Sequence, residues 1–276
     1  MASALMKPEH YQDFREFLER ACGIVLGENK QYLVASRLAP VMLEHGFHDL
    51  GELVAQLDRF GGGNLRAQVI EAMTTNETQF FRDNYPYAIL KEYVFPELQK
   101  RRVYNARVWS AGCSSGQEAY SISMSLQEYN EQGGRLDGEV LGTDISPQIV
   151  EQASLGRYNS SAITRGLTDE RRVRFFRELD PQTWEVRPEI KRRASFRTHN
   201  LLESFAVLGR FDVIFVRNVL IYFSVESRTD ILARMAKTLN PGGYLIVGAS
   251  ESLARQADDY EMIRLPKGVI YQVRGN

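Results

Sequence analysis

Cysteine is scarce in this sequence of 276 residues, and its two cysteines, Cys22 and Cys113, lie far apart in dissimilar surroundings. A framework of disulfide bonds is therefore not expected, and a reducing compartment such as the cytoplasm fits this composition. Long apolar runs are also missing, since no stretch approaches the roughly 20 residues that cross a bilayer. The charged and polar residues 7–10 precede any long apolar run, so we expect no signal peptide. We predict a cytoplasmic protein that does not insert into membranes.

The sequence also has no marked excess of positive or negative charge, because its 34 Lys and Arg residues nearly balance 35 Asp and Glu residues, for a net charge of -1. Sequence-independent nucleic-acid binding depends on many cations that neutralise phosphates, so this balance argues against a nucleic-acid partner. The one basic cluster, Lys191-Arg192-Arg193, is either a contact for an acidic partner or a solvated edge. The histidines lack the spacing of metal ligands, so no metal site is expected; they are His10, His45, His48 and His199.

What the sequence does contain is, first, a helical periodicity over its first 73 residues. Tyr11, Phe14, Phe17 and Leu18 recur at the spacing of one helix face, which is typical of a helix core. Further helices are predicted at 31–45 before Gly46, at 50–60 before the glycines 61–63, and from 64 to 73. We predict a small helical domain at 1–73 and a linker at 74–90.

From Pro96 onward, short apolar runs alternate with helical stretches, which predicts an α/β fold with a parallel sheet covered on both faces. The predicted helices are 117–129, a helix beginning at Ser146-Pro147, and 226–239. The predicted strands are 107–111, 139–143, 194–198, 211–216 and 244–247, followed by a closing hairpin of 260–265 and 268–273. We assign 91–276 to this domain and 178–194 to a small antiparallel β-subdomain. Ligands of such sheets bind beyond the carboxyl ends of the strands.

A glycine turn, Ala111-Gly112-Cys113-Ser114-Ser115-Gly116, joins the first predicted strand to a helix that begins near Glu118. Glycine allows the backbone to approach a ligand closely, and the helix start offers free N–H groups. The alternative is a tight turn without a ligand. The spacing is not G-x-G-x-x-G, and no Lys-Ser/Thr follows the second glycine, so neither NAD nor ATP is favoured.

Asp144 closes the second predicted strand, where an acidic side chain can accept hydrogen bonds from ribose hydroxyls. The alternative is that Asp144 caps the helix beginning at Pro147. Together with the glycine turn at the adjacent strand, Asp144 favours a nucleoside ligand.

Two motifs are sharper. Residues 75–82 read Thr-Asn-Glu-Thr-Gln-Phe-Phe-Arg, and residues 217–223 read Arg-Asn-Val-Leu-Ile-Tyr-Phe. With these segments the sequence resembles the chemoreceptor glutamate methyltransferases, the CheR family. Three further segments match, at 109–121, at 142–145, and from 240–243 through 250–252, so the resemblance runs over essentially the whole chain.

The resemblance implies a Rossmann-like class I methyltransferase domain with a small β-subdomain, preceded by an all-α domain. It implies S-adenosyl-L-methionine (SAM) as cofactor and S-adenosyl-L-homocysteine (SAH) as product. The resemblance also implies that the enzyme forms glutamate 5-O-methyl esters. Its partner would be the cytoplasmic helical domain of bacterial chemoreceptors. The enzyme would be a monomer that binds this domain at receptor arrays. The residues that would bind the cofactor are Asn76, Thr78, Arg82, Gly112, Glu118, Asp144, Asn200, Leu201, Arg217 and Asn218.

Methyl transfer to a glutamate requires positioning and no general base, because the carboxylate is already ionised at pH 7. Arg82 is the candidate clamp, since a guanidinium grips a carboxylate through two parallel hydrogen bonds. Tyr222 is the second candidate catalytic residue, through its hydroxyl. The alternatives are an interdomain salt bridge for Arg82 and a core position beside Phe223 for Tyr222. For Cys113, packing in the turn is preferred over a role as nucleophile.

The segment around 180–183 contains no glycine, whereas some relatives have a glycine-containing insertion that grips a receptor's C-terminal tether. Direct recognition of the receptor helix bundle is therefore favoured. Two rival functions remain open at this point. One is a methyltransferase acting on a small molecule or RNA, and the other is a non-catalytic SAM-sensing adaptor.

Overall fold

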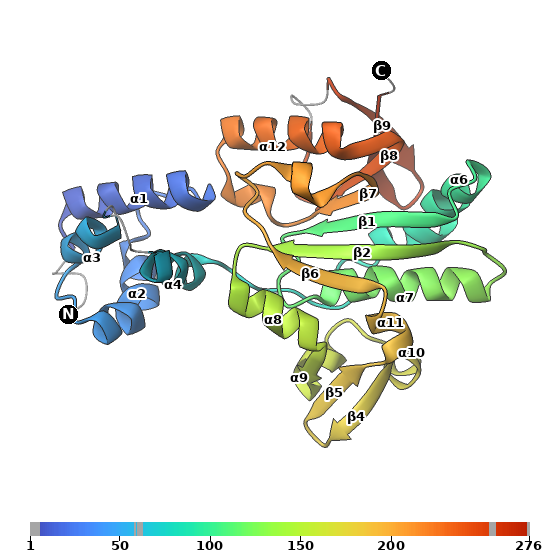
Figure 1. Cartoon of the computed structure of the whole chain (residues 1–276), viewed down its shortest axis with the longest axis horizontal. Helices are drawn as coiled ribbons and strands as arrows, with labels where there is room; N and C mark the ends of the chain where they lie inside the picture. The colour runs from blue at the N-terminus through green and yellow to red at the C-terminus, as the bar shows by residue number, and fades with distance from the viewer. Residues whose placement is uncertain (1–5, 58, 60–62, 254–257, 275–276) are drawn as a thin grey trace.

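The computed structural model describes residues 6–57, 59, 63–253 and 258–274, and shows a helical part beside a larger α/β part (Figure 1). The helical part contains α1 (Pro8–Cys22), α2 (Gln31–His45), α3 (Leu50–Leu57) and α4 (Gly63–Met73). Its core includes Phe14 and Phe17, which confirms the predicted face of the first helix. The third helix was predicted to continue to Phe60, but α3 ends at Leu57 and Arg59 is not helical; residues 58 and 60–62 lie outside the described residues.

The main sheet has the strand order β6-β2-β1-β7-β8-β10-β9. Five neighbouring strands from β6 to β8 run parallel, while β10 is antiparallel to both β8 and β9. The predicted Rossmann-like fold and its closing hairpin are thereby confirmed. The strands are β1 (Asn105–Ala111), β2 (Asp137–Asp144), β6 (Ala194–Thr198), β7 (Phe211–Val216), β8 (Leu239–Val247), β9 (Tyr260–Leu265) and β10 (Gly268–Val273).

Helices cover both faces of this sheet, as the continuous apolar run of β7 requires. Alternate residues of β7 enter two separate cores. Val213 and Phe215 pack on the side of α7 (Gln117–Glu131), whereas Ile214 and Val216 pack on the side of α12 (Val225–Thr238). Because both faces are buried, the polar groups that could meet a ligand are confined to the ends of the strands.

A helical run that begins inside the predicted linker 74–90 and extends toward β1 was not predicted from the sequence. It consists of α5 (Tyr85–Ile89), a π-helical turn η2 (Leu90–Val94) and α6 (Phe95–Lys100). Pro86 and Pro96 interrupt the sequence pattern, but each lies at the start of its helix, where the missing N–H costs nothing.

The small antiparallel sheet is larger than the predicted segment 178–194. Its order is β3-β5-β4, and β6, which begins at Ala194, belongs to the main sheet instead. The first strand, only three residues long, is too short to show a period in the sequence. The elements of this region are α8 (Pro147–Leu155), β3 (Arg157–Asn159), α9 (Ser160–Thr164), α10 (Asp169–Phe175), β4 (Phe176–Asp180), β5 (Thr183–Val186) and α11 (Pro188–Lys191).

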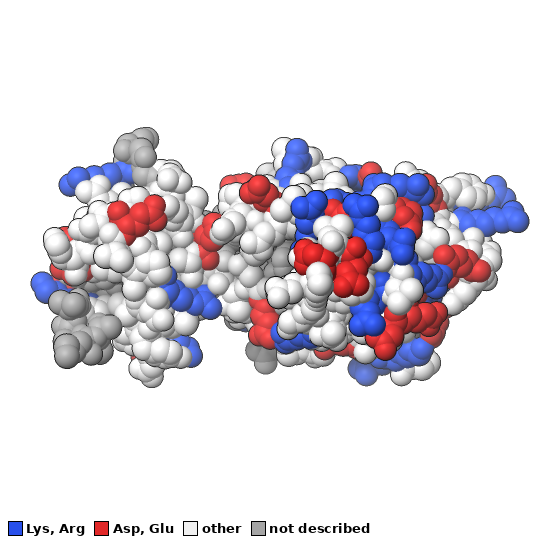
Figure 2. All heavy atoms as spheres, turned by 90° about the horizontal axis from the view of Figure 1, so that it is seen from below, with Lys and Arg blue, Asp and Glu red and all other residues white. Residues whose placement is uncertain are grey.

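The basic cluster 191–193 is largely engaged within the protein. Lys191 Nζ donates to the carbonyl of Leu155 at 2.8 Å, and Arg193 Nη1 donates to Gln127 Oε1 at 3.0 Å. On the face that contains the small sheet, acidic side chains are interspersed among the basic ones (Figure 2). Lys191 and Arg193 are thus partly buried and bonded within the protein, and the solvated-edge interpretation describes only Arg192, which is exposed. None of the described helices combines the length and apolar composition of a membrane span.

Candidate functional site

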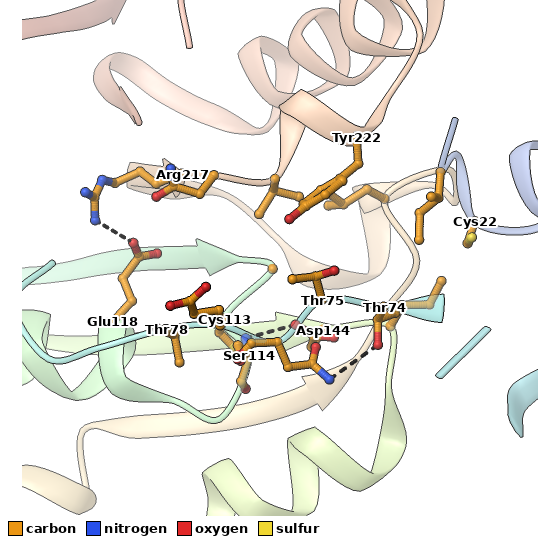
Figure 3. Close-up of a pocket in the computed structure, with 18 of the residues that line it drawn as sticks. Cys22, Thr74, Thr75, Thr78, Cys113, Ser114, Glu118, Asp144, Arg217 and Tyr222 are labelled. Carbon is orange, nitrogen blue, oxygen red and sulfur yellow. Dashed lines mark hydrogen bonds and ion pairs between the residues drawn. The ribbon is translucent and has the colours of Figure 1, made fainter. Parts of the chain in front are cut away.

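A pocket lies at the carboxyl ends of β1, β2, β6 and β7, beneath the linker that follows α4 (Figure 3). Each site residue predicted from the sequence lines this one pocket: Asn76, Thr78, Arg82, Gly112, Glu118, Asp144, Asn200, Leu201, Arg217, Asn218 and Tyr222. Segments more than 100 residues apart in the sequence thus meet at the edge of the sheet where ligands of this fold bind. Their assignment to a cofactor remains a prediction.

Asp144 is buried at the end of β2 and is held by two backbone N–H groups. Its Oδ2 accepts from Ser114 N at 2.9 Å, and its Oδ1 accepts from Ser146 N at 3.2 Å. Burial raises the pKa of the Asp144 carboxyl, although these backbone hydrogen bonds oppose the rise. The cap of α8 is Ser146, whose Oγ accepts from Ile149 N at 3.1 Å. The capping alternative for Asp144 is therefore wrong. A carboxylate has about four acceptor positions, so Asp144 can still accept hydrogen bonds from a ligand.

The glycine turn is required by packing as well as by any ligand. Gly112 has φ +70°, and a Cβ at this position would lie 2.5 Å from Cγ2 of Val219. Ser114 Oγ donates to the carbonyl of Asn76 at 2.8 Å, so the turn also fixes the linker above it. Cys113 is buried in the turn, and burial raises the pKa of its thiol well above the ordinary value. A protonated, buried thiol fits the packing interpretation of Cys113.

Arg217 is a buried cation that joins the helix α7 to the linker. Its Nη1 lies 3.1 Å from Glu118 Oε2, and its Nη2 donates to Asp83 Oδ2 at 2.6 Å and to the carbonyl of Arg82 at 3.0 Å (Figure 3 shows the pair with Glu118). Burial raises the pKa of the Glu118 carboxyl, while Arg217 and the hydroxyl of Ser110 act to lower it. Most of the guanidinium is engaged inside the protein, so Arg217 holds the backbone that carries Arg82.

Arg82 and Tyr222 approach the pocket from different segments. Arg82 Nη1 donates to the carbonyl of Glu77 at 3.2 Å, and no ion pair of Arg82 occurs within the described ranges. The salt-bridge alternative is thus not what the structure contains. The ring of Tyr222 extends over the cavity (Figure 3), and its hydroxyl has no hydrogen-bond partner in the part of the chain that the structure describes. Phe223, and not Tyr222, is the buried member of the pair.

The helical domain forms one wall of the pocket, which the sequence analysis missed. Cys22 and Ile24, which follow one another closely at the end of α1, line the cavity. The N–H of Val25 donates to the carbonyl of Tyr222 at 2.8 Å. Gly23 ends α1 with φ +78°, and a Cβ there would lie 2.3 Å from the ring of Phe223. A glycine after a helix predicts a C-cap, but nothing in the sequence indicated this distant contact.

Asn200 joins the two domains through its side chain. Its Nδ2 donates to the carbonyl of Ala21 at 2.8 Å, and its Oδ1 accepts from Leu202 N at 3.0 Å. The sequence analysis predicted a cofactor contact for Asn200. In the structure, both ends of its amide hold the protein together at the rim of the pocket.

Glu251 was part of a recognised motif, but the sequence analysis gave it no role. Its carboxylate accepts from the backbone N–H groups of Asn218 at 2.6 Å, Val219 at 3.0 Å and Gly248 at 2.8 Å. Asn218 has φ +59°, a conformation that non-glycine residues adopt only when it is stabilised. Oδ1 of Asn218 is buried and has no partner among the described residues. Glu251 therefore fixes the turn that presents Asn218 to the pocket.

Comparison with known proteins accounts for nearly the whole chain. Residues 9–74 match the family model described as "CheR methyltransferase, all-alpha domain", and residues 76–269 match "CheR methyltransferase, SAM binding domain". Chemotaxis protein methyltransferase Cher2 of Pseudomonas putida is 49% identical over 268 residues, which cover 96% of this chain and 98% of that protein.

Two further relatives are similar over their full length. Chemotaxis protein methyltransferase 1 of Pseudomonas aeruginosa is 49% identical over 268 residues, covering 96% of this chain and 97% of its own. A chemotaxis protein methyltransferase of Vibrio parahaemolyticus is 43% identical over 278 residues, which cover 99% of this chain and 100% of that protein. The chain therefore belongs to the CheR methyltransferase family and contains both its all-α domain and its SAM-binding domain.

Proposed function

We propose that this enzyme transfers the methyl group of SAM to glutamate side chains of bacterial chemoreceptors and so forms glutamate 5-O-methyl esters. The observation that carries this proposal is the meeting of Arg82 and Tyr222 in the same pocket as Asp144. A nucleoside-binding carboxylate and two groups that suit an acceptor carboxylate thus border one cavity. Relatives 43–49% identical are chemotaxis protein methyltransferases, which supports the same conclusion.

The residues of the pocket fit SAM. The Asp144 carboxylate would accept hydrogen bonds from the ribose hydroxyls, and the buried, unpartnered Oδ1 of Asn218 would accept one from a polar group of the ligand. Gly112 lines the pocket without a side chain where the cofactor would pass. The linker residues Asn76 and Thr78 would close over it. When bound, SAM would supply a methyl group on a positively charged sulfur: an acceptor carboxylate oxygen would bond to the methyl carbon as the carbon–sulfur bond breaks, and neutral SAH would be the leaving group.

The remaining chemistry belongs to the protein. An ionised glutamate needs no base, so the protein must orient its oxygen and exclude water, and such positioning is worth about 7–11 kcal/mol. The guanidinium of Arg82 would hold the acceptor carboxylate, and the hydroxyl of Tyr222 would donate to it. Arg217 holds the backbone of Arg82 in place through a hydrogen bond to its carbonyl.

The proposed partner is the cytoplasmic helical domain of a chemoreceptor, recognised by a monomeric enzyme in the bacterial cytoplasm at receptor arrays. The loop between β4 and β5 is short, since β4 ends at Asp180 and β5 begins at Thr183. A compact β-subdomain of this kind supports direct recognition of the receptor helices and not capture of a C-terminal tether.

The test is a transfer assay with methyl-labelled SAM and a purified cytoplasmic receptor fragment. We expect base-labile label on glutamates of the fragment, and loss of transfer in Arg82→Ala. Arg82→Lys should recover little, because an ammonium cannot reproduce the two-pronged grip. Label found only on RNA or small molecules would replace the acceptor proposed here. SAH binding without transfer to any acceptor would indicate a sensing adaptor instead.

A further inference from the structure

The linker that carries Arg82 has an unusual backbone. Phe81, Asp83 and Asn84 have φ values of +49°, +67° and +52°, so three of the four residues from 81 to 84 are left-handed without being glycine. Such conformations persist only where the surroundings hold them. Arg217 holds the linker on the pocket side, through Arg82 and Asp83. The opposite side must be held as well.

The β-subdomain contacts that opposite side. The side chain of Phe80 is fully buried. Its ring packs edge to face against Tyr158 of β3 and Phe176 of β4, with ring centres 4.9 and 5.3 Å apart. Gly166, with φ +90°, passes so close to the linker that a Cβ there would lie 1.9 Å from the carbonyl oxygen of Phe80. The segment just before Arg82 is therefore packed against this small sheet and its connections, while the N–H of Phe81 donates to Ser121 Oγ of α7 at 3.0 Å.

Arg171 of α10 makes a third contact. Its guanidinium carbon lies 3.6 Å from the centre of the Phe81 ring. The buried carboxylate of Glu128 holds this guanidinium through two hydrogen bonds of 2.7 and 3.0 Å, and Lys91 Nζ also donates to Glu128 at 2.6 Å. Arg171 is thus a rigid cation pressed against the residue that precedes Arg82, where the interaction with the ring is favourable.

At the surface, Arg165 extends the same contact. Its Nη2 lies 2.6 Å from Glu77 Oε1, and its Nε donates to Gln79 Oε1 at 3.0 Å. No residue from 146 to 198 lines the pocket, as far as the described residues go. The β-subdomain therefore reaches the site through the linker and through the glycine turn, where the hydroxyl of Tyr158 donates to the carbonyl of Ser115 at 2.7 Å.

We propose that Arg171, supported by Glu128, is a positioning residue that fixes Arg82 for methyl transfer, so that the β-subdomain acts as a scaffold for the catalytic linker. This inference rests on the proposed role of Arg82. Arg171 contacts the linker at Phe81, next to Arg82, whereas Asp144, the proposed ribose contact, lies on β2 and is held by Ser114 and Ser146. Loss of Arg171 should therefore slow transfer more than it weakens SAH binding. A misplacement of about 1 Å can cost roughly 100-fold in rate.

The experiment compares Arg171→Gln with Arg174→Gln in the full-length protein. Arg174 lies on the same helix and pairs with Glu131 of α7, but it does not contact the linker, so the two variants remove the same charge from the same element. We would measure kcat and KM for transfer to a receptor fragment, and the Kd of SAH by calorimetry. We expect Arg171→Gln to lower kcat about 10-fold and to change the SAH Kd less than about 2-fold. Arg174→Gln should change kcat and the SAH Kd by less than about 2-fold each. Arg171→Lys should recover part of the kcat that Arg171→Gln loses.

A second variant, Arg165→Gln, removes a surface contact and leaves the buried packing intact; it should lower kcat about 3-fold. Equal rates in Arg171→Gln and Arg174→Gln would overturn the inference, as would a loss of rate matched by an equal loss of SAH affinity. Arg82→Ala in the same assay separates the two claims. If Arg82→Ala is inactive while Arg171→Gln is unaffected, only this inference fails. If Arg82→Ala retains the wild-type rate, the role proposed for Arg82 fails, and this inference with it.

Discussion

The backbone N–H of Val25 donates a hydrogen bond to the carbonyl of Tyr222 at 2.8 Å. This bond ties the loop after α1 to the short 3-10 helix η4 (Leu220–Tyr222), which presents a candidate catalytic hydroxyl. The all-α domain is therefore part of the wall of the candidate site as well as a neighbour of the SAM-binding domain. Its contact with the site depends on Gly23, which packs against Phe223.

Gly23→Ala should loosen this contact, and Gly46→Ala provides a matched control. Both glycines end a helix with positive φ, +78° and +72°, but a Cβ at Gly46 would meet nothing within 4 Å. We expect Gly46→Ala to cost about 1 kcal/mol of unfolding free energy, and Gly23→Ala to cost about 1–3 kcal/mol more. Gly23→Ala alone should also weaken SAH binding. Equal effects of the two changes in urea unfolding and calorimetry would contradict this role of Gly23.

Tyr222→Phe removes only the hydroxyl. A hydrogen bond to a charged acceptor is worth about 1.5–3 kcal/mol, so kcat should fall by about 10-fold or more. Stability should change by less than about 0.5 kcal/mol, because the hydroxyl has no partner among the described residues. Steady-state kinetics with a receptor fragment and urea unfolding test both points. A loss of stability with unchanged kcat would make Tyr222 a structural residue.

Glu251→Gln tests the turn that carries Asn218. A carboxamide has one acceptor oxygen, and its NH₂ group would face N–H groups that the carboxylate now accepts from. We expect the SAH Kd to rise by about 10-fold, since unpaired buried donors cost about 1–3 kcal/mol. Wild-type affinity in this variant would mean that the turn holds without Glu251.

Acidification should weaken SAH binding through Asp144. Burial raises the pKa of this carboxyl, so it takes up a proton at a higher pH than an exposed aspartate does, and a protonated Asp144 cannot accept from two ribose hydroxyls. For folding the sign is opposite: a carboxyl whose pKa is raised in the folded state adds stability as the pH falls through that pKa. Calorimetry from about pH 7.5 to about pH 5 should show a rising Kd in the wild type. Asp144→Asn should flatten that dependence, and an unchanged slope would assign it to another group such as Glu118.

The sequence was sufficient where one physical constraint dominates a segment. The strands β7 and β6 were predicted to the residue, because short apolar or alternating runs ended by polar residues leave little choice. The pocket-lining set followed from the resemblance, together with the rule that ligands bind at strand ends. Even so, the structure gives Arg217 and Asn200 contacts within the protein that no local pattern indicated.

The features that the sequence did not predict are short elements and contacts between residues far apart in the chain. The three residues of β3 are too few to show a period, and the helical run from Tyr85 is masked by its prolines. The approach of Cys22 and Ile24 to the pocket depends on how two domains pack. Glu251 acts through three backbone groups, and backbone partners leave no mark in the sequence.

The most direct test of the account is a calorimetric titration of the protein with SAH, in the wild type and in Asp144→Ala. The account places the nucleoside at the ends of β1 and β2, with its ribose on Asp144. It therefore predicts measurable binding to the wild type and a Kd at least about 100-fold weaker in the variant, the cost of two lost charge-assisted hydrogen bonds. Equal affinity in the two proteins would contradict it.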